Sequence, residues 1–133
     1  MAALKFEIVT PHEKTCSEDV EMVTLPGVEG EMGIYPQHVP LVTQIVPGEI
    51  IVRKDGQDHF LAVGEGFAEI TADRVAIMTD MAIAAENIDE AKAEQARRNA
   101  EARLAEKLSD EDAARVNAAL AQSLVQLRVK RRR

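Results

Sequence analysis

The sequence predicts an all-β N-terminal sandwich of about ten strands followed by a C-terminal α-helical hairpin. The prediction comes from a change in composition near residue 87. Val, Ile and Thr, which favour strands, number 24 in residues 1–87 and only 4 in the remaining 46 residues, where Ala supplies 11. All 7 glycines and all 5 prolines lie before residue 67. We therefore predict two domains, residues 1–87 and residues 88–133.

Short alternating segments separated by turn residues fill the first domain, which is typical of a sandwich or a barrel. Asp55-Gly56 predicts a type I′ hairpin turn, because these residue types suit positive φ angles. The alternation places Phe6, Phe60 and Phe67 inward, so we expect their rings in a core between two packed sheets. The expected strands are residues 5–9, 20–25, 31–35, 41–46, 49–54, 57–63, 66–71 and 74–78.

Two helices are predicted after Gly66, where no further Gly or Pro interrupts the chain. Asn87 or Asp89 is expected to cap the first helix, since acidic groups also suit the positive end of a helix. Ser109 and the acidic residues after it predict a break and a second N-cap, so the helices should fold back antiparallel. The predicted buried stripes are Ala93, Ala96, Ala100, Leu104 and Leu108, then Ala113, Val116, Leu120, Leu124 and Leu127.

Alanine dominates the first of these stripes, and this limits how strongly the hairpin can dock. Each buried alanine contributes one methyl group, about 0.8 kcal/mol. High helix propensity keeps both helices formed whether or not they are docked. The composition therefore predicts a hairpin that opens without melting, and a hairpin that never opens is the alternative.

The sequence contains no recognisable catalytic constellation. It has no Gly-x-x-x-x-Gly-Lys phosphate loop, and Cys16 is alone, which excludes an internal disulfide or a cysteine zinc site. His12, His38 and His59 lack the spacing of metal ligands. The net charge of −7 argues against a nucleic-acid partner. We expect neither a metal nor an active site in this chain.

The segment from Leu25 to Leu41, LPGVEGEMGIYPQHVPL, resembles the epsilon subunit of bacterial F-type, proton-translocating ATP synthases. That family shows a Gly-x-x-Gly-x-x-Gly-[IV]-x-Pro-x-His-x-Pro-Leu pattern at this point. Further family segments follow in order along the chain: Pro47-Gly48, Gly66-Phe67-Ala68-Glu69, Asp80-Met81-Ala82, Ile88-Asp89-Glu90-Ala91-Lys92-Ala93 and Gln126-Leu127-Arg128-Val129. The resemblance implies a ten-strand β-sandwich and a helical hairpin, in agreement with the composition.

The resemblance also implies a role as a non-catalytic rotor subunit of the central stalk. The sandwich would bind the gamma subunit and the c-subunit ring, and would couple the catalytic head to proton flow. The hairpin would extend toward the alpha and beta subunits and block ATP hydrolysis. The expected location is the cytoplasmic face of the bacterial plasma (inner) membrane, peripherally, with no cofactor except ATP as a weak regulatory ligand. A free-standing adaptor that presents its hairpin to another partner is the alternative.

Three sets of contact residues follow from the resemblance. They are Glu29, Gly30, Glu31 and Met32 for the c ring, His38, Val39, Leu41 and Val42 for gamma, and Ile88, Asp89, Lys92 and Ala93 for a nucleotide. Glu31 is alternatively an exposed turn carboxylate and His38 a hydrogen-bonded turn residue. Asp89 with Lys92 is alternatively a helix cap with an ion pair. Lys92 stands where nucleotide-binding members carry arginine, and it lacks the planar fork that suits phosphate.

A basic tail ends the chain: Arg128, Lys130, Arg131, Arg132 and Arg133. Residues 88–127 hold 6 basic and 8 acidic groups, so the tail provides the positive excess of the second domain. Such a block suits an acidic partner surface, and the resemblance implies acidic segments of the beta subunits. We predict that the tail strengthens inhibition, the alternative being a frayed, solvated terminus.

Overall fold

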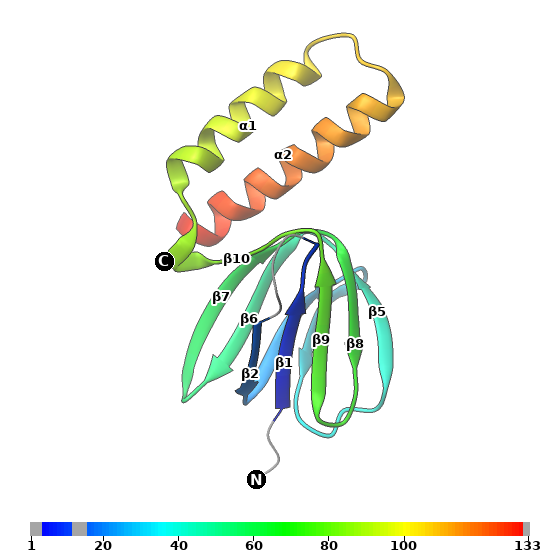
Figure 1. The fold of residues 1–133 in the computed structure, drawn as a ribbon, viewed down its shortest axis with the longest axis vertical. Coiled ribbons are helices and arrows are strands. Elements are labelled where there is room, and N and C mark those ends of the chain that lie inside the picture. The colour runs from blue at the N-terminus through cyan, green and yellow to red at the C-terminus, as the bar shows by residue number, and fades with distance from the viewer. Residues whose placement is uncertain (1–3, 12–15, 132–133) are drawn as a thin grey trace.

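A curved β-sheet with two helices across one end makes up the chain (Figure 1). This computed structural model describes residues 4–11 and 16–131. The strands are β1 (Leu4–Val9), β2 (Cys16–Val20), β3 (Met22–Gly27), β4 (Gly30–Ile34), β5 (Leu41–Ile45), β6 (Gly48–Lys54), β7 (Gln57–Val63), β8 (Gly66–Ile70), β9 (Arg74–Thr79) and β10 (Ala82–Ala84). The helices are the 3₁₀ turn η1 (Ala85–Asn87), α1 (Glu90–Leu104) and α2 (Asp110–Arg131).

The strands form one continuous sheet that curls around a shared core. Their order is β10-β7-β6-β3-β5-β8-β9-β1-β2, and β4 pairs with β3 outside this path. Among the described strands, β1 runs parallel to β9 and the other ladders are antiparallel. At its far end β2 approaches β6, where the Lys54 Nζ lies 3.1 Å from the Glu18 Oε2. The prediction of a ten-strand sandwich with a helical hairpin is confirmed.

Alternating side chains of these strands fill the core. In β1, Leu4, Phe6 and Ile8 point inward and are at most 7% exposed, while the residues between them face outward. The core consists of Leu4, Phe6, Ile8, Val20, Val23, Leu25, Ile34, Ile45, Ile50, Val52, Val63, Ala68, Ile70, Val75 and Ile77.

The predicted hairpin turn between β6 and β7 is confirmed. Asp55 has φ 53° and Gly56 has φ 76°, the left-handed conformation that a type I′ turn requires at both positions. The Gly56 N–H also donates to the Glu21 Oε1 at 3.0 Å, which ties the turn to the bend between β2 and β3.

Two strand predictions are wrong in detail. The sequence predicts one strand over residues 20–25, but β2 ends at Val20 and β3 begins at Met22, with the Glu21 N–H bonded to the Arg53 carbonyl at 2.8 Å. Phe67, expected in the core, is 53% exposed. Strand β8 has apolar residues on both faces, and it is Ala68, not Phe67, that points inward.

Local signals at both helix starts are confirmed. The Lys92 N–H donates to the Asp89 Oδ1 at 3.1 Å, so Asp89 caps α1. The Asp112 N–H donates to the Ser109 Oγ at 3.2 Å, which places the predicted break and second start at Ser109. Helix α1 ends at Leu104, so Leu108 lies in the connection and not on the predicted helical stripe.

The buried faces of the helices differ from the predicted stripes. Ala96 is exposed, and Leu124 is 48% exposed. Helix α2 packs against both α1 and the β domain, which widens its buried arc beyond a single stripe. The buried residues of α2 are Val116, Ser123, Val125, Leu127 and Val129.

Candidate functional site

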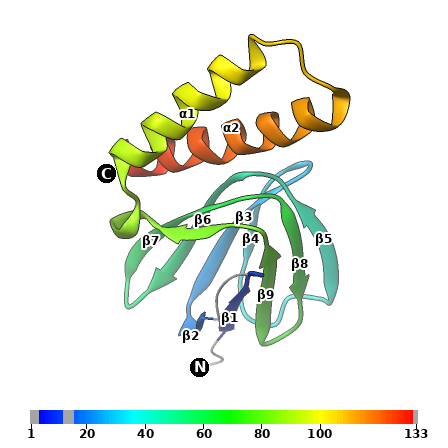
Figure 2. The ribbon, with the colours of Figure 1, turned by 45° about the horizontal axis from the view of Figure 1, so that its top comes forward.

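The hairpin is folded down on the β domain through α2 (Figure 2). Helix α2 lies across β7, β6 and η1, and α1 lies on its outer side. The docking cluster, by which we mean the buried apolar residues joining α2 to the β domain, contains Ala62, Ala85, Ile88, Val125 and Val129. The partly buried Phe60, Met81 and Ile83 pack against this cluster.

Three polar contacts accompany this cluster. The Gln122 Nε2 donates to the Asp80 Oδ2 at 3.0 Å, and the Lys130 Nζ donates to the Ala85 carbonyl at 3.3 Å. The Gln126 Nε2 lies 3.7 Å from the Met81 Sδ. A Cβ at residue 64 would overlap the Asp80 carboxylate, so a larger residue there would displace the side chain that holds Gln122.

Arg131, in the last turn of α2, joins the two helices. Its Nε lies 2.7 Å from the Glu90 Oε1 and its Nη2 lies 3.0 Å from the Glu94 Oε2, both on α1. The hydrogen bond with Glu90, followed by that with Glu94, raises the pKa of Arg131. Glu94 also pairs with Arg97 on its own helix.

The structure therefore separates the predicted basic tail into parts. Arg131 is held by α1 and Lys130 by η1, whereas Arg128 is exposed and lines a hollow with Glu31. Arg132 and Arg133 lie outside the described residues. Inhibition by the tail stays a prediction.

The four candidate nucleotide residues all lie at the start of α1. Ile88 is 5% exposed within the docking cluster, and Ala93 is 3% exposed. The Asp89 carboxylate caps the helix by accepting from the Lys92 N–H, while the Lys92 side chain is exposed. Nucleotide binding at these residues stays a prediction. Within the described part of the chain, no group of three or more His, Cys, Asp or Glu side chains could hold a metal ion.

The candidate c-ring residues lie on the β3–β4 hairpin. Glu29 is at its two-residue tip, Gly30 and Glu31 are exposed at the start of β4, and Met32 is partly buried against the core. Leu41, a candidate gamma residue on β5, lines the same open hollow of about 550 Å³ as this segment. The structure thus brings one residue of the predicted gamma set, Leu41, beside the predicted c-ring set.

The other candidate gamma residues are exposed to different degrees. Val39 is 72% exposed and Val42 66% exposed, whereas His38 is half-buried with its Nδ1 2.6 Å from the Val39 carbonyl oxygen. The preceding Gln37 donates its N–H to the Ala72 carbonyl at 2.5 Å, which anchors this loop to the β8–β9 turn.

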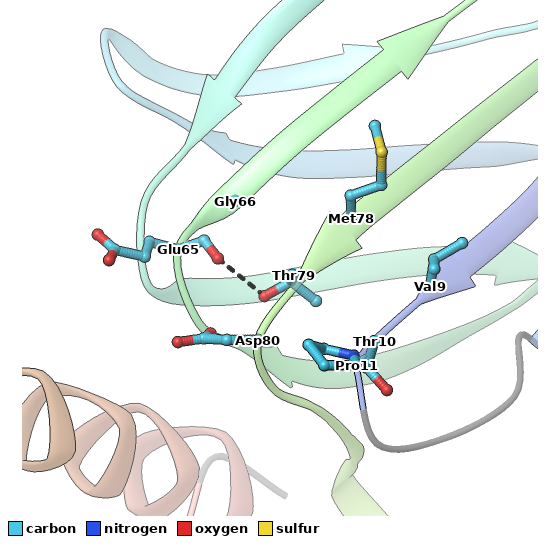
Figure 3. Close-up of a pocket in the computed structure, with 8 residues that line it drawn as sticks. All are labelled: Val9, Thr10, Pro11, Glu65, Gly66, Met78, Thr79 and Asp80. Atoms are coloured by element: carbon cyan, nitrogen blue, oxygen red, sulfur yellow. Dashed lines mark hydrogen bonds between the residues drawn. The ribbon is translucent and has the colours of Figure 1, made fainter.

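An exposed apolar row that the sequence did not reveal crosses β1, β9 and β8. Val9 pairs with Met78 and Met78 with Phe67, and these side chains are 42%, 41% and 53% exposed. On the next strand Val42 continues this apolar row, two residues from the Gln44 that pairs with Phe67. Figure 3 shows Val9 and Met78 on neighbouring strands, beside the Thr79 hydroxyl that bonds to the Glu65 carbonyl at 3.1 Å. The sequence feature that could have predicted this row is the presence of apolar residues at outward as well as inward positions of β8.

The fold is a β-sandwich with a docked helical hairpin, and its exposed apolar row is typical of the class of protein-binding modules. Residues 3–85 match the family of the ATP synthase delta/epsilon chain β-sandwich domain, and residues 86–131 match its long α-helix domain. The chain therefore belongs to the ATP synthase delta/epsilon chain family, which confirms the resemblance found in its motifs. As an epsilon chain it is a non-catalytic subunit of that complex.

Similar proteins support this assignment over nearly the full length. The ATP synthase epsilon chain of Herpetosiphon aurantiacus is 44% identical over 95% of this chain and 93% of its own. That of Dehalococcoides mccartyi is 41% identical over 100% of this chain and 96% of its own. A chain in the cryo-EM structure of the Euglena gracilis mitochondrial ATP synthase, OSCP/F1/c-ring in rotational state 1, superposes with a TM-score of 0.77. That chain has 26% identity over 96% of this chain and 81% of its own.

None of the helices in residues 4–11 and 16–131 has the length and apolar character needed to cross a bilayer.

Proposed function

We propose that this chain is a rotor subunit in the central stalk of an F-type ATP synthase. It binds gamma through the outer face of β5, β8, β9 and β1, and it rests on the c ring through the β3–β4 hairpin. The complex holds it peripherally on the cytoplasmic face of the bacterial plasma membrane. This attachment couples the alpha and beta subunits of the catalytic head to proton flow.

The observation that supports this proposal is the exposed apolar row. Val9, Val42, Phe67 and Met78 are each at least 41% exposed on adjacent strands that the helices leave uncovered. A contiguous apolar surface of this kind is characteristic of a protein interface. The similar Euglena gracilis chain comes from a structure named for OSCP, F1 and the c ring, which agrees with such an interface.

The second part of the proposal concerns the hairpin. In the folded state α2 docks through the docking cluster and a few polar contacts. We infer that the hairpin also extends toward the alpha and beta subunits, where the basic tail meets an acidic surface and ATP hydrolysis stops. ATP, as a weak regulatory ligand, would bind at the start of α1.

Replacing Phe67 and Met78 by alanine tests the gamma interface. Buried aromatic anchors dominate interfaces, so the full chain should bind an epsilon-depleted F1 complex about 10-fold or more weakly. Tyr35→Ala is the matched control, because Tyr35 is 61% exposed and lies outside the apolar row. Calorimetric titration measures both affinities, and circular dichroism checks the fold.

Equal affinity of the Phe67→Ala/Met78→Ala variant and the unchanged chain would contradict this interface. A chain that does not bind the gamma-containing complex at all would instead support a free-standing adaptor.

A further inference from the structure

One guanidinium connects the two ends of the helical hairpin. Arg131 lies in the last turn of α2, and Glu90 and Glu94 lie in the first turns of α1. The two carboxylates are four residues apart, which places them on one helix face. The planar fork of arginine suits such a pair of acceptors, and its Nε and Nη2 lie 2.7 Å and 3.0 Å from them.

We propose that Arg131, Glu90 and Glu94 form a latch that sets the balance between the closed and open hairpin. The cation that serves an acidic partner in the open state is held by the protein's own carboxylates in the closed state. This proposal rests on the proposed function in one respect, namely that the hairpin moves.

The position of these ion pairs distinguishes them from the others on the helices. Arg97 pairs with Glu101 within α1, and Arg115 pairs with Glu111 within α2, so both pairs persist when the helices separate. Among the described residues, the ion pairs that join α1 to α2 are those of Arg131. Opening of the hairpin therefore breaks the latch while leaving the other helical pairs intact.

The strength of the latch suits a two-state element. The side chains of Arg131, Glu90 and Glu94 are 57%, 48% and 21% exposed, so each pair shifts an equilibrium only a few-fold. The docking cluster, with Phe60, Met81 and Ile83 packed against it, is the larger contribution to closing. The latch nevertheless changes the opening equilibrium constant by its own factor, whatever the other contributions are. A few-fold shift is then enough to change the population of the open state.

The latch also predicts competition with a partner. A single Arg131 guanidinium cannot bind the α1 carboxylates and an acidic surface at the same time. The latch therefore lowers the affinity of the open hairpin for an acidic surface. By reciprocity, the bound acidic surface lowers the population of the closed hairpin by the same factor.

Thiol labelling of the full-length chain tests the latch directly. Ser123 is 5% exposed, and Ser123→Cys in a Cys16→Ser background provides a buried thiol that becomes reactive when the hairpin opens. With closing faster than labelling, the labelling rate is proportional to the opening equilibrium constant. Glu90→Gln, which removes one ion pair, should raise the rate roughly twofold to fivefold, and Arg131→Gln, which removes two, should raise it more.

The double variant and two matched controls complete the experiment. The labelling rate of the Glu90→Gln/Arg131→Gln double variant should rise by less than the product of the two single fold-changes, because both substitutions remove the same interaction. Glu101→Gln and Arg115→Gln remove equal charges whose partners lie within one helix, and they should leave the rate near that of the parent chain.

Labelling rates of Glu90→Gln and Arg131→Gln equal to those of the two controls would overturn the latch, whatever happens to ATP hydrolysis. Faster labelling of Glu90→Gln, which keeps the Arg131 cation for a partner, with unchanged hydrolysis by the assembled complex would support the latch and contradict inhibition by the open hairpin. Faster labelling with slower hydrolysis would support both.

Discussion

Glu94 has three arginine partners, which makes it a sensitive probe of the hairpin at the residue scale. Arg97 and Arg98 lie on its own helix, and Arg131 reaches it from α2. The hydrogen bond from Arg97, and after it the hydrogen bond from Arg131, holds the pKa of Glu94 below its ordinary value of 4.5, although burial opposes this shift.

Arg131→Gln should raise the pKa of Glu94 toward 4.5, because one of the two hydrogen-bonding cations is removed. Since the folded pKa is the lower one, the Glu94 carboxylate stabilises the folded chain above pH 4.5, and this contribution disappears as the pH falls through the folded pKa. Only the part that comes from Arg131 favours the closed hairpin, because Arg97 lies on the same helix as Glu94. Carbon-detected NMR titration of the carboxyl group measures the shift. Arg115→Gln is the control, and an identical Glu94 pKa in both variants would contradict the contact.

At the scale of elements, α2 determines how the hairpin docks. Val129 is 0% exposed within the docking cluster, whereas Leu124 on the same helix is 48% exposed. The sequence stripe placed Leu124 on the buried seam, and the structure gives that role to Val125 and Val129. The seam predicted from the sequence makes Leu124 the more sensitive position to alanine substitution, whereas the docking cluster makes Val129 the more sensitive one.

Val129→Ala should lower the free energy of unfolding by about 1 kcal/mol, because two buried methyl groups are lost and the better helix propensity of alanine offsets part of that loss. Leu124→Ala, the matched control, should change it by less than about 0.5 kcal/mol. Urea denaturation followed by circular dichroism measures both. A larger loss for Leu124→Ala than for Val129→Ala would restore the seam predicted from sequence.

Local chemistry explains which features the sequence could predict. The Asp55-Gly56 turn and the Asp89 and Ser109 caps depend on neighbouring backbone groups, so their sequence signals were sufficient. The exposed Phe67 depends on which face of β8 meets the core, and the exposed Leu124 depends on how α2 meets the β domain. The partners of Arg131 are 37 and 41 residues away, and no short-range pattern contains that pairing.

At the scale of the whole molecule, the structure shows where the charged groups of the two domains lie in the closed state. The net charge of −7 combines an acidic first domain with a basic tail. In the closed structure part of that tail is turned inward, with Arg131 on α1 carboxylates and Lys130 on the Ala85 carbonyl. The chain therefore presents less positive charge to partners when the hairpin is closed than when it is open.

A reducible cross-link that locks the hairpin closed tests whether the hairpin must open to inhibit ATP hydrolysis. Met81→Cys and Gln126→Cys, in a Cys16→Ser background, are joined through a short bis-methanethiosulfonate spacer, because the 3.7 Å between the Gln126 Nε2 and the Met81 Sδ separates the tips of two long side chains, and a direct bridge needs Cβ atoms about 4 Å apart. The measurement is ATP hydrolysis by the assembled complex before and after reduction. Hydrolysis should be faster in the cross-linked, locked complex and should return to the inhibited rate when the cross-link is reduced. Equal inhibition in both states would contradict a hairpin that must open to inhibit.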